Sequence, residues 1–309
     1  MDDSSRAPIR VICGPTAAGK TYAAVWFARL AALSVVSADS RQIYRGFDIG
    51  TAKPTHREQL AVPHFGIDVL DPTERASAAW WAGHADAWID QIVASGRTPV
   101  VVGGTGLYLR ALFGTLFEEP AMHAGDRAAI QASLADHSTE ELRRWVSVLD
   151  PDRAHLGRTQ LLRAIEIALL TGHRVSDLHR EHARPPRRRA RYLVVDPGPD
   201  LAIQIASRSS FMLTNGWLDE VRTLMREIPE DAPAWNASGY RTIREMVRGN
   251  ISAAQAEERI VIETRQYAKR QRTWFRHQLA GEDVTRANPH QPNWEEQAMA
   301  WWNEGARTE

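Results

Sequence analysis

Short apolar runs alternate with segments of helical spacing in the first 113 residues. Residues 9–13, 33–37 and 98–102 are mainly apolar runs with the length of buried strands. Residues 22–30 are compatible with a helix, and residues 78–94 carry apolar side chains at helical spacing. Strands that alternate with helices predict an α/β fold, in which helices cover both faces of a parallel sheet.

The pattern changes after residue 113. Strand signals disappear, and the polar segments 126–134, 139–148 and 159–170 have helical spacing. A basic linker with two prolines at residues 182–189 precedes the next apolar run, at residues 192–196. We therefore predict a helical insertion between two strands of one sheet.

The remaining segments are predicted to be mainly helical. One amphipathic stretch runs through Phe211, Leu213, Trp217, Val221 and Leu224, and a second covers residues 253–277. The last residues are acidic and rich in tryptophan, which favours a packing tail. The expected organisation is a first core part, a helical insertion, a return strand with C-terminal helices, and an acidic tail, at residues 1–113, 114–190, 191–281 and 282–309.

Composition narrows the class of protein. No run of 18 apolar residues and no signal peptide is recognisable, so we expect a cytoplasmic protein with no membrane span. The single cysteine, Cys13, excludes an intrachain disulfide and is expected to be a small core residue. Net charge is zero, so bulk charge does not indicate a nucleic-acid binder. Among 38 basic residues, Lys20, Lys53 and Lys269 are the only lysines, so each position could favour a compact ammonium over a guanidinium.

The first strand leads directly into a phosphate-binding motif. The motif has the form Gly-x-x-x-x-Gly-Lys-Thr, between an apolar run and a helix, which is the context of a P-loop. In such loops backbone N–H groups surround phosphate oxygens, the lysine adds a positive charge, and the threonine hydroxyl ligates Mg²⁺. We expect a P-loop NTPase-like core with a diphosphate site made by Gly14, Pro15, Thr16, Ala17, Ala18, Gly19, Lys20 and Thr21, the last as the metal ligand.

The reaction is less evident from the residues alone. The strand at residues 98–102 ends in Gly-Gly-Thr-Gly, without the carboxylate that an ordinary P-loop ATPase would place there. Asp196 is followed by Pro197 and Gly198 and is interpreted as a turn residue. Asp39 ends the second strand and would face the phosphate site, where a carboxylate can accept a proton. A helix N-cap explains Asp39 equally well at this point.

Four motifs in order along the chain resemble the bacterial tRNA dimethylallyltransferase (tRNA isopentenyltransferase) family. They are the P-loop, the run Asp39-Ser40-Arg41-Gln42-Ile43-Tyr44 continuing to Pro54, the segment Gly103-Gly104-Thr105-Gly106-Leu107-Tyr108, and Tyr267-Ala268-Lys269-Arg270-Gln271-Arg272-Thr273-Trp274-Phe275. The resemblance implies transfer of a dimethylallyl group from dimethylallyl diphosphate to the N6 amine of the adenine 3′ of a tRNA anticodon, with Mg²⁺ on the diphosphate.

The resemblance also implies roles for individual residues. Asp39 would be the general base, with Thr105 and Arg208 as further catalytic groups near the amine and the diphosphate. The tRNA anticodon stem-loop would be bound by Asp39, Ser40, Arg41, Gln42, Thr105, Arg127, Arg163, Lys269, Arg270 and Gln271. A monomer without a membrane partner is expected.

Three positions depart from the family pattern. Gln160 stands where an arginine is usual, Phe65 where a histidine is usual, and Thr242 where a glutamine is usual. Two other activities stay open: an isopentenyltransferase that acts on free adenine nucleotides, and a P-loop small-molecule kinase. A non-catalytic RNA-binding protein would tolerate loss of Asp39.

Overall fold

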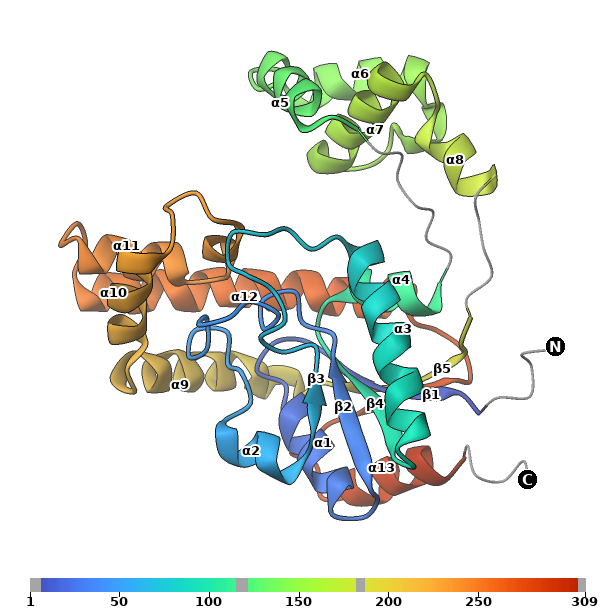
Figure 1. Cartoon of the computed structure of the whole chain (residues 1–309), viewed down its shortest axis with the longest axis vertical. Coiled ribbons are helices and arrows are strands. Elements are labelled where there is room, and N and C mark those ends of the chain that lie inside the picture. The colour runs from blue at the N-terminus through green and yellow to red at the C-terminus, as the bar shows by residue number, and fades with distance from the viewer. Residues whose placement is uncertain (1–6, 115–121, 182–186, 305–309) are drawn as a thin grey trace. The chain divides into compact units, whose positions relative to one another are not determined.

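A computed structural model of the chain describes residues 7–114, 122–181 and 187–304 (Figure 1). Within these residues, six strands form one parallel sheet in the order β3-β2-β4-β1-β5-β6. This arrangement confirms the predicted α/β class. The strands are β1 (Ile9–Cys13), β2 (Leu33–Ser37), β3 (His64–Phe65), β4 (Thr98–Gly103), β5 (Ala190–Val195) and β6 (Val284–Ala287).

Helices cover both faces of the sheet, as predicted, because successive strand residues alternate between two apolar layers. Val11, Val36 and Val101 face one layer, while their neighbours face the other. The first layer lies under α3 (Ala78–Ala94), α4 (Gly106–Phe113), α10 (Trp217–Glu227), α11 (Tyr240–Val247) and α12 (Ala253–Gln278). The second lies under α1 (Lys20–Ala28) and α13 (Trp294–Asn303), which Figure 1 shows side by side. The other α-helices described in the sheet unit are α2 (His56–Ala61) and α9 (Leu201–Thr214).

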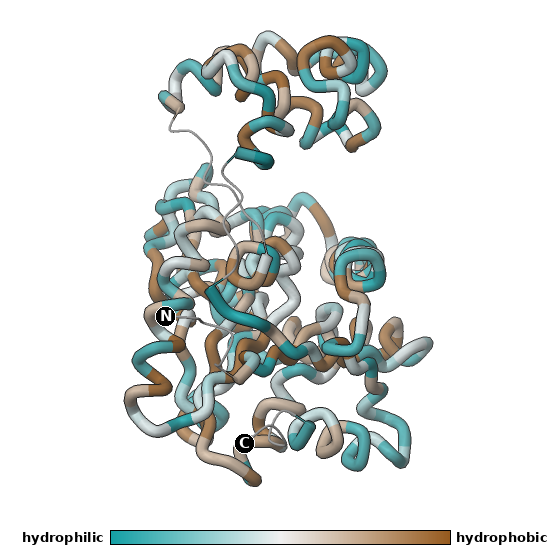
Figure 2. Tube along the Cα trace, turned by 90° about the vertical axis from the view of Figure 1, so that its right-hand side faces the viewer, coloured by the Kyte–Doolittle hydropathy of each residue, from teal (hydrophilic) through white to brown (hydrophobic). Residues whose placement is uncertain are grey.

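The chain divides into two compact units, residues 1–113 with 187–309, and residues 114–186. The second unit contains α5 (Ala124–Ser133), α6 (Thr139–Leu149), α7 (Arg158–Thr171) and α8 (Val175–Glu181). Its own apolar core includes Leu142, Val146, Leu161 and Ile165. In both units, helices carry hydrophobic and hydrophilic residues together, as Figure 2 shows.

Three predicted boundaries need correction. The insertion does not extend to residue 190, because Ala190 already begins β5. The predicted amphipathic stretch is two helices, since Gly216 adopts a φ of 98° between α9 and α10. Residues 282–304 are not a separate tail, because they contribute β6 and α13 to the sheet unit. Residues 182–186 of the predicted linker lie outside the described residues; Arg188, which follows them, is buried and paired with Asp86.

The described helices include none that is both long and apolar enough to cross a membrane.

Candidate active site at the carboxyl ends of the strands

The P-loop connects β1 to α1 and depends on glycine at both ends. Gly14 has a φ of 148°, and a Cβ there would lie 2.1 Å from the carbonyl oxygen of Val195. Gly19, the N-cap of α1, has a φ of 89° and offers no side-chain acceptor to the helix. The amide groups at the start of α1 are therefore left to bind an anion, in the direction that the helix dipole favours.

Two cations approach this loop from different elements. Lys20 Nζ donates to the carbonyl oxygens of Gly14 at 3.1 Å and Pro15 at 2.8 Å. Arg208, on α9, donates through Nη2 to Thr16 Oγ1 at 2.6 Å. Burial lowers the pKa of Lys20 to about 8 and the pKa of Arg208 to about 10, while attraction to Asp39 partly offsets both shifts. The positive charge of these two half-buried side chains suits a di-anionic ligand.

The ends of β2 and β4 bring Asp39 and Thr105 to the same place. The two strands approach so closely that a Cβ on Gly103 would lie 2.1 Å from the carbonyl oxygen of Ala38. Thr105 Oγ1 accepts a hydrogen bond from the Ser40 amide at 3.1 Å. Asp39 Oδ1 accepts from the Arg41 amide at 2.8 Å, an arrangement that resembles a cap and fixes the carboxylate. Oδ2 of Asp39 is then the oxygen that can accept a proton.

Helix α12 closes the site with two inward side chains. Gln271 is buried; its Oε1 accepts from the Thr16 amide at 2.8 Å and its Nε2 donates to the Gly104 carbonyl at 2.8 Å. Gln271 thus joins the P-loop to the end of β4. Tyr267 is close enough to Thr105 for a side-chain hydrogen bond, and burial, reinforced by the charge of Asp39, raises the pKa of Tyr267 to about 12.

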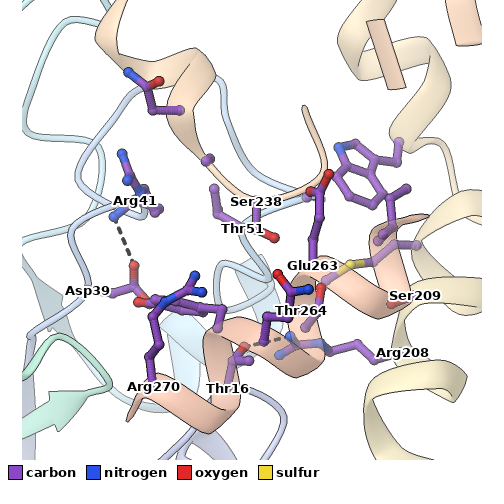
Figure 3. Close-up of a pocket in the computed structure, with 18 residues that line it drawn as sticks. Thr16, Asp39, Arg41, Thr51, Arg208, Ser209, Ser238, Glu263, Thr264 and Arg270 are labelled. Carbon is purple, nitrogen blue, oxygen red and sulfur yellow. Dashed lines mark hydrogen bonds between the residues drawn. The ribbon is translucent and has the colours of Figure 1, made fainter. Parts of the chain in front are cut away.

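Two cavities meet at these residues. One, of about 440 Å³, is lined by the P-loop, Lys20 and Thr21. The other, of about 370 Å³, is lined by Arg41, Tyr267 and Arg270. Both are bordered by Thr16, Asp39, Thr51 and Arg208. Figure 3 shows Asp39 and Arg270 on one side of the second cavity and Arg208 with Thr16 on another. A group bound in one cavity would meet a group bound in the other at Asp39.

The donor atoms in the P-loop cavity fit Mg²⁺. The Thr21 hydroxyl and the Asp39 carboxylate both line it, and hard oxygen ligands are what Mg²⁺ prefers. In the part of the chain that the structure describes, no group of three or more His, Cys, Asp or Glu side chains could hold a metal ion. A Mg²⁺ ion here would therefore depend on oxygens of the bound diphosphate and on water, as is usual for this ion.

Comparison with protein families decides the class of protein. A model described as IPP transferase matches residues 42–278, and one described as Isopentenyl transferase matches residues 7–63. The chain belongs to the IPP transferase family. A tRNA dimethylallyltransferase of an Anaeromyxobacter species is 42% identical over 272 residues, which cover 86% of this chain and 90% of the relative. Another, from a Synechococcus species, is 38% identical over 281 residues, 89% of this chain and 90% of the relative. The predicted membership of the tRNA dimethylallyltransferase family, and with it a prenyl-transferring enzyme, is confirmed.

Solved structures agree with this assignment. The tRNA isopentenylpyrophosphate transferase of Bacillus halodurans is 31% identical with a TM-score of 0.67, covering 96% of this chain and 95% of that one. A eukaryotic dimethylallyltransferase acting on tRNA, 24% identical, has a TM-score of 0.76 over 97% of this chain and 77% of that one. The latter shows the likeness of fold.

The residues that the family resemblance assigns to tRNA fall into two groups in the sheet unit. Arg41 and Arg270 line the 370 Å³ cavity, and Lys269 is exposed beside Arg270. Gln42 and Gln271 instead use their amides inside the protein. Gln42 donates to the carbonyls of Thr51 and Ala52 at 3.2 and 3.0 Å, and Gln271 is held as described above. These internal bonds support the shape of the site; contact of either glutamine with RNA stays a prediction.

The helical unit holds the two predicted arginines on one buried carboxylate. Glu166 accepts from Arg163 Nη1 at 2.7 Å and lies 3.4 Å from Arg127 Nη2. Gln131 Nε2 also donates to Glu166, at 2.5 Å. The Arg127 ion pair and the Gln131 hydrogen bond join α5 to α7, while the Arg163 pair lies within α7. Contact of either arginine with tRNA stays a prediction.

The three departures from the family pattern each have a local structural role. Gln160 Oε1 accepts from the Gly157 amide at 3.1 Å and so caps the start of α7. Thr242 donates to Glu263 Oε1 at 3.2 Å, which joins α11 to α12. Phe65 packs against the larger apolar core. None of the three side chains lines either cavity.

Several residues of the site were not assigned from the sequence. Glu263 and Thr264 line the 370 Å³ cavity from α12, beside Tyr267 of the family motif, and residues 236–238 line it from the loop before α11. The helical spacing of Glu263, Tyr267 and Arg270 was the available signal, since residues three and four apart share one face. No local pattern marks residues 236–238.

Proposed function

We propose that the protein transfers a dimethylallyl group from dimethylallyl diphosphate to the exocyclic N6 amine of the adenine next to a tRNA anticodon. The observation that supports this most directly is the pair of cavities that meet at Asp39 and Arg208, one with a P-loop and one with aromatic and basic side chains. Membership of the family indicates the class of reaction, the transfer of a prenyl group. We infer the position of the adenine in the anticodon loop from the resemblance of the motifs.

On the donor side, the diphosphate would lie against the start of α1. In the structure, Lys20 donates to two carbonyls of its own loop, so donor binding would redirect this ammonium toward phosphate oxygens. Arg208 would add a second positive charge where the leaving diphosphate gains negative charge. Mg²⁺, held by Thr21 and the diphosphate, would neutralise part of the same charge.

On the acceptor side, the adenine would enter the cavity lined by Tyr267 and Arg270. A base must leave its stack to reach such a pocket, at a cost of roughly a few kcal/mol. This cost is smaller for a base in a loop than for a base in a duplex. Aromatic and guanidinium planes are common partners of such bases. Thr105 would present its hydroxyl near Asp39, and the Ser40 amide, which donates to Thr105 Oγ1, would hold that hydroxyl in place.

The transfer itself requires one bond to form and one to break. The adenine N6 forms a bond to C1 of the dimethylallyl group while the C1–O bond to diphosphate breaks, and the diphosphate leaves with the electron pair. The N6 proton passes to Oδ2 of Asp39, because Oδ1 is already occupied by the Arg41 amide. The carboxylate is thereby protonated once in each turnover.

The experiment that tests the function uses ¹⁴C-dimethylallyl diphosphate and Mg²⁺. The acceptors are an unmodified anticodon stem-loop with adenine 3′ of the anticodon and, in parallel, free AMP. We expect label in the stem-loop and none in AMP. Label in AMP alone would identify a free-nucleotide isopentenyltransferase. Absence of label in both, together with phosphate transfer from ATP, would identify a kinase.

Replacement of Asp39 tests the proposed base. Asp39→Asn keeps the Oδ1 acceptor for the Arg41 amide, so the loop should keep its shape, but it removes the basic oxygen. We expect kcat to fall by about 10²–10⁴-fold with stem-loop affinity unchanged. Asp231→Asn, at an exposed position outside both cavities, is the matched control. Near-normal turnover of Asp39→Asn would remove the general-base role.

A further inference from the structure

A third cavity lies at the carboxyl ends of β5 and β6, separate from the two described above. Its volume is about 660 Å³, and it is lined by Asp196 and Asn288 after the strands and by side chains of α12 and α13. Carboxyl ends of parallel strands are where α/β proteins bind ligands. A cavity of this size can hold a molecule as large as a nucleotide.

The charge of this cavity is positive. Arg272, Arg276 and Arg286 all line it, and Arg272 is paired with Asp196. Among the described residues, no carboxylate lies within ion-pair distance of Arg276 or Arg286. Arg286 Nη2 donates to the carbonyls of Phe275 and Leu279 at 3.1 and 3.0 Å, so its Nε and Nη1 donors are left for another partner.

The remaining lining suits a ligand with both a phosphate and an apolar ring. Asn288, Gln291 and Gln297 add amide groups, and Val194, Leu279 and Ala287 add apolar surface. Guanidinium groups bind phosphate oxygens in a bidentate manner, while amides and apolar side chains suit a base and its polar edge.

The cavity faces away from the acceptor side of the enzyme. At 3.6 residues per turn, Arg272 and Arg276 lie on one side of the buried stripe formed by Ala268, Gln271 and Phe275. Tyr267 and Arg270, which line the acceptor cavity, lie on the other side of this stripe. An RNA loop bound to one flank of α12 would not reach the opposite flank through the buried stripe. The third cavity therefore favours a small, free ligand.

We propose that this third cavity binds a phosphate group carried by a free nucleoside phosphate, at a site distinct from the P-loop. The site has a physical connection to the P-loop. Arg272, which borders the third cavity, follows Gln271, which holds the Thr16 amide. On the other side, Pro289 follows the cavity residue Asn288, and a Cβ on Gly19 would lie 3.7 Å from Pro289 Cγ. A ligand in this cavity would thus contact Arg272 and Asn288, the sequence neighbours of Gln271 and Pro289, which lie against the P-loop.

Isothermal titration with ADP tests the proposal, using the full chain with its donor site first saturated by dimethylallyl thiodiphosphate and Mg²⁺. We expect one ADP to bind per chain. Arg276→Gln should weaken this binding at least tenfold, because Arg276 lines the cavity and has neither an ion pair nor a hydrogen bond within the described part of the chain. Arg259→Gln, at an exposed arginine of the same helix outside the cavity, should leave it unchanged. Arg286 is not used, because its bonds to the end of α12 would confuse binding with stability.

Three results would overturn the proposal: no ADP binding when the donor site is filled, equal affinity in Arg276→Gln and the unaltered protein, or a tenfold loss of stem-loop affinity in Arg276→Gln with ADP binding intact. The last would assign the cavity to RNA backbone. Label transfer to the stem-loop is measured for each variant, so failure of this site is distinguished from unfolding and from failure of the proposed function.

Discussion

Replacing Gln271 by leucine separates a structural role from contact with RNA. Gln271 joins the Thr16 amide of the P-loop to the Gly104 carbonyl after β4, and its side chain is buried. Leucine has a similar volume and fills the same space without hydrogen bonding. Both main-chain groups would lose their partner, and the P-loop would lose its connection to the end of β4.

The magnitude follows from the environment of the two groups. Thr16 borders both site cavities, so water can replace its lost partner at a net loss of about 1 kcal/mol. The bond to the Gly104 carbonyl is buried, and an unsatisfied buried acceptor costs about 1–3 kcal/mol. We therefore expect a loss of about 2–4 kcal/mol in the free energy of unfolding, or a fall of roughly 5–10 °C in Tm. Donor affinity should fall as well, since the Thr16 segment would no longer be held in place.

The assay combines urea unfolding with separate KM values for donor and stem-loop. Gln278→Leu, on an exposed turn of the same helix, is the control and should change stability by less than about 0.5 kcal/mol. Normal stability and donor KM in Gln271→Leu, with a raised KM for the stem-loop alone, would refute the structural role and restore direct contact with RNA.

Three further predictions concern individual side chains. Burial lowers the pKa of Lys20 to about 8, and a bound diphosphate favours the ammonium, so donor affinity should fall by up to tenfold per pH unit as pH rises above 8. Titration calorimetry from pH 7 to about 9.5 checks this; Lys20→Arg should lack the change, and a flat profile for the unaltered protein would contradict it. Lys53 Nζ donates to the Tyr44 carbonyl at 2.6 Å and to the carboxylates of Asp48 and Asp68, so Lys53→Arg should lower the free energy of unfolding by about 1–3 kcal/mol in urea. Lys269→Arg, at an exposed position, is its control. Equal losses of unfolding free energy in the two variants would disprove the requirement for an ammonium at position 53. Thr105→Val keeps the shape but removes the hydroxyl beside Asp39, so single-turnover transfer should slow by about 10²-fold; an unchanged rate would exclude this hydroxyl from the chemistry.

Strands with an uninterrupted apolar run, and helices with apolar residues at helical spacing along their whole length, were predictable from the sequence. The strand at residues 33–37 and the helix at residues 78–94 match β2 and α3 residue for residue. β3 and β6 were missed, because β3 has two residues and β6, with the sequence Val-Thr-Arg-Ala, has no apolar run. These edge strands form because they pair with β2 and β5. Such pairing cannot be predicted from the local sequence.

The site was predictable where a motif places its atoms at a strand end. The P-loop, Asp39 and Thr105 follow three parallel strands, so their proximity follows from the fold. The direction of a side chain was not predictable in the same way. Gln42 and Gln271 are polar residues within motifs, yet the structure turns both inward, because unpaired main-chain groups nearby need partners. Hydrogen bonds of this kind join segments that are distant in the sequence, so they become evident only in the folded structure.

The bond between Gln271 and Thr16 also has a consequence for the order of events during synthesis. The two residues are separated by 255 positions, which a ribosome that adds about 5–20 residues per second covers in roughly 13–50 s. During the earlier part of that interval, until β5 (Ala190–Val195) has been made, β1 lacks this neighbour, and one edge of the central strand is open to other chains. The nascent protein should therefore depend on chaperones until β5 emerges, and a ribosome-bound chain stalled before α12 should have no ordered donor site.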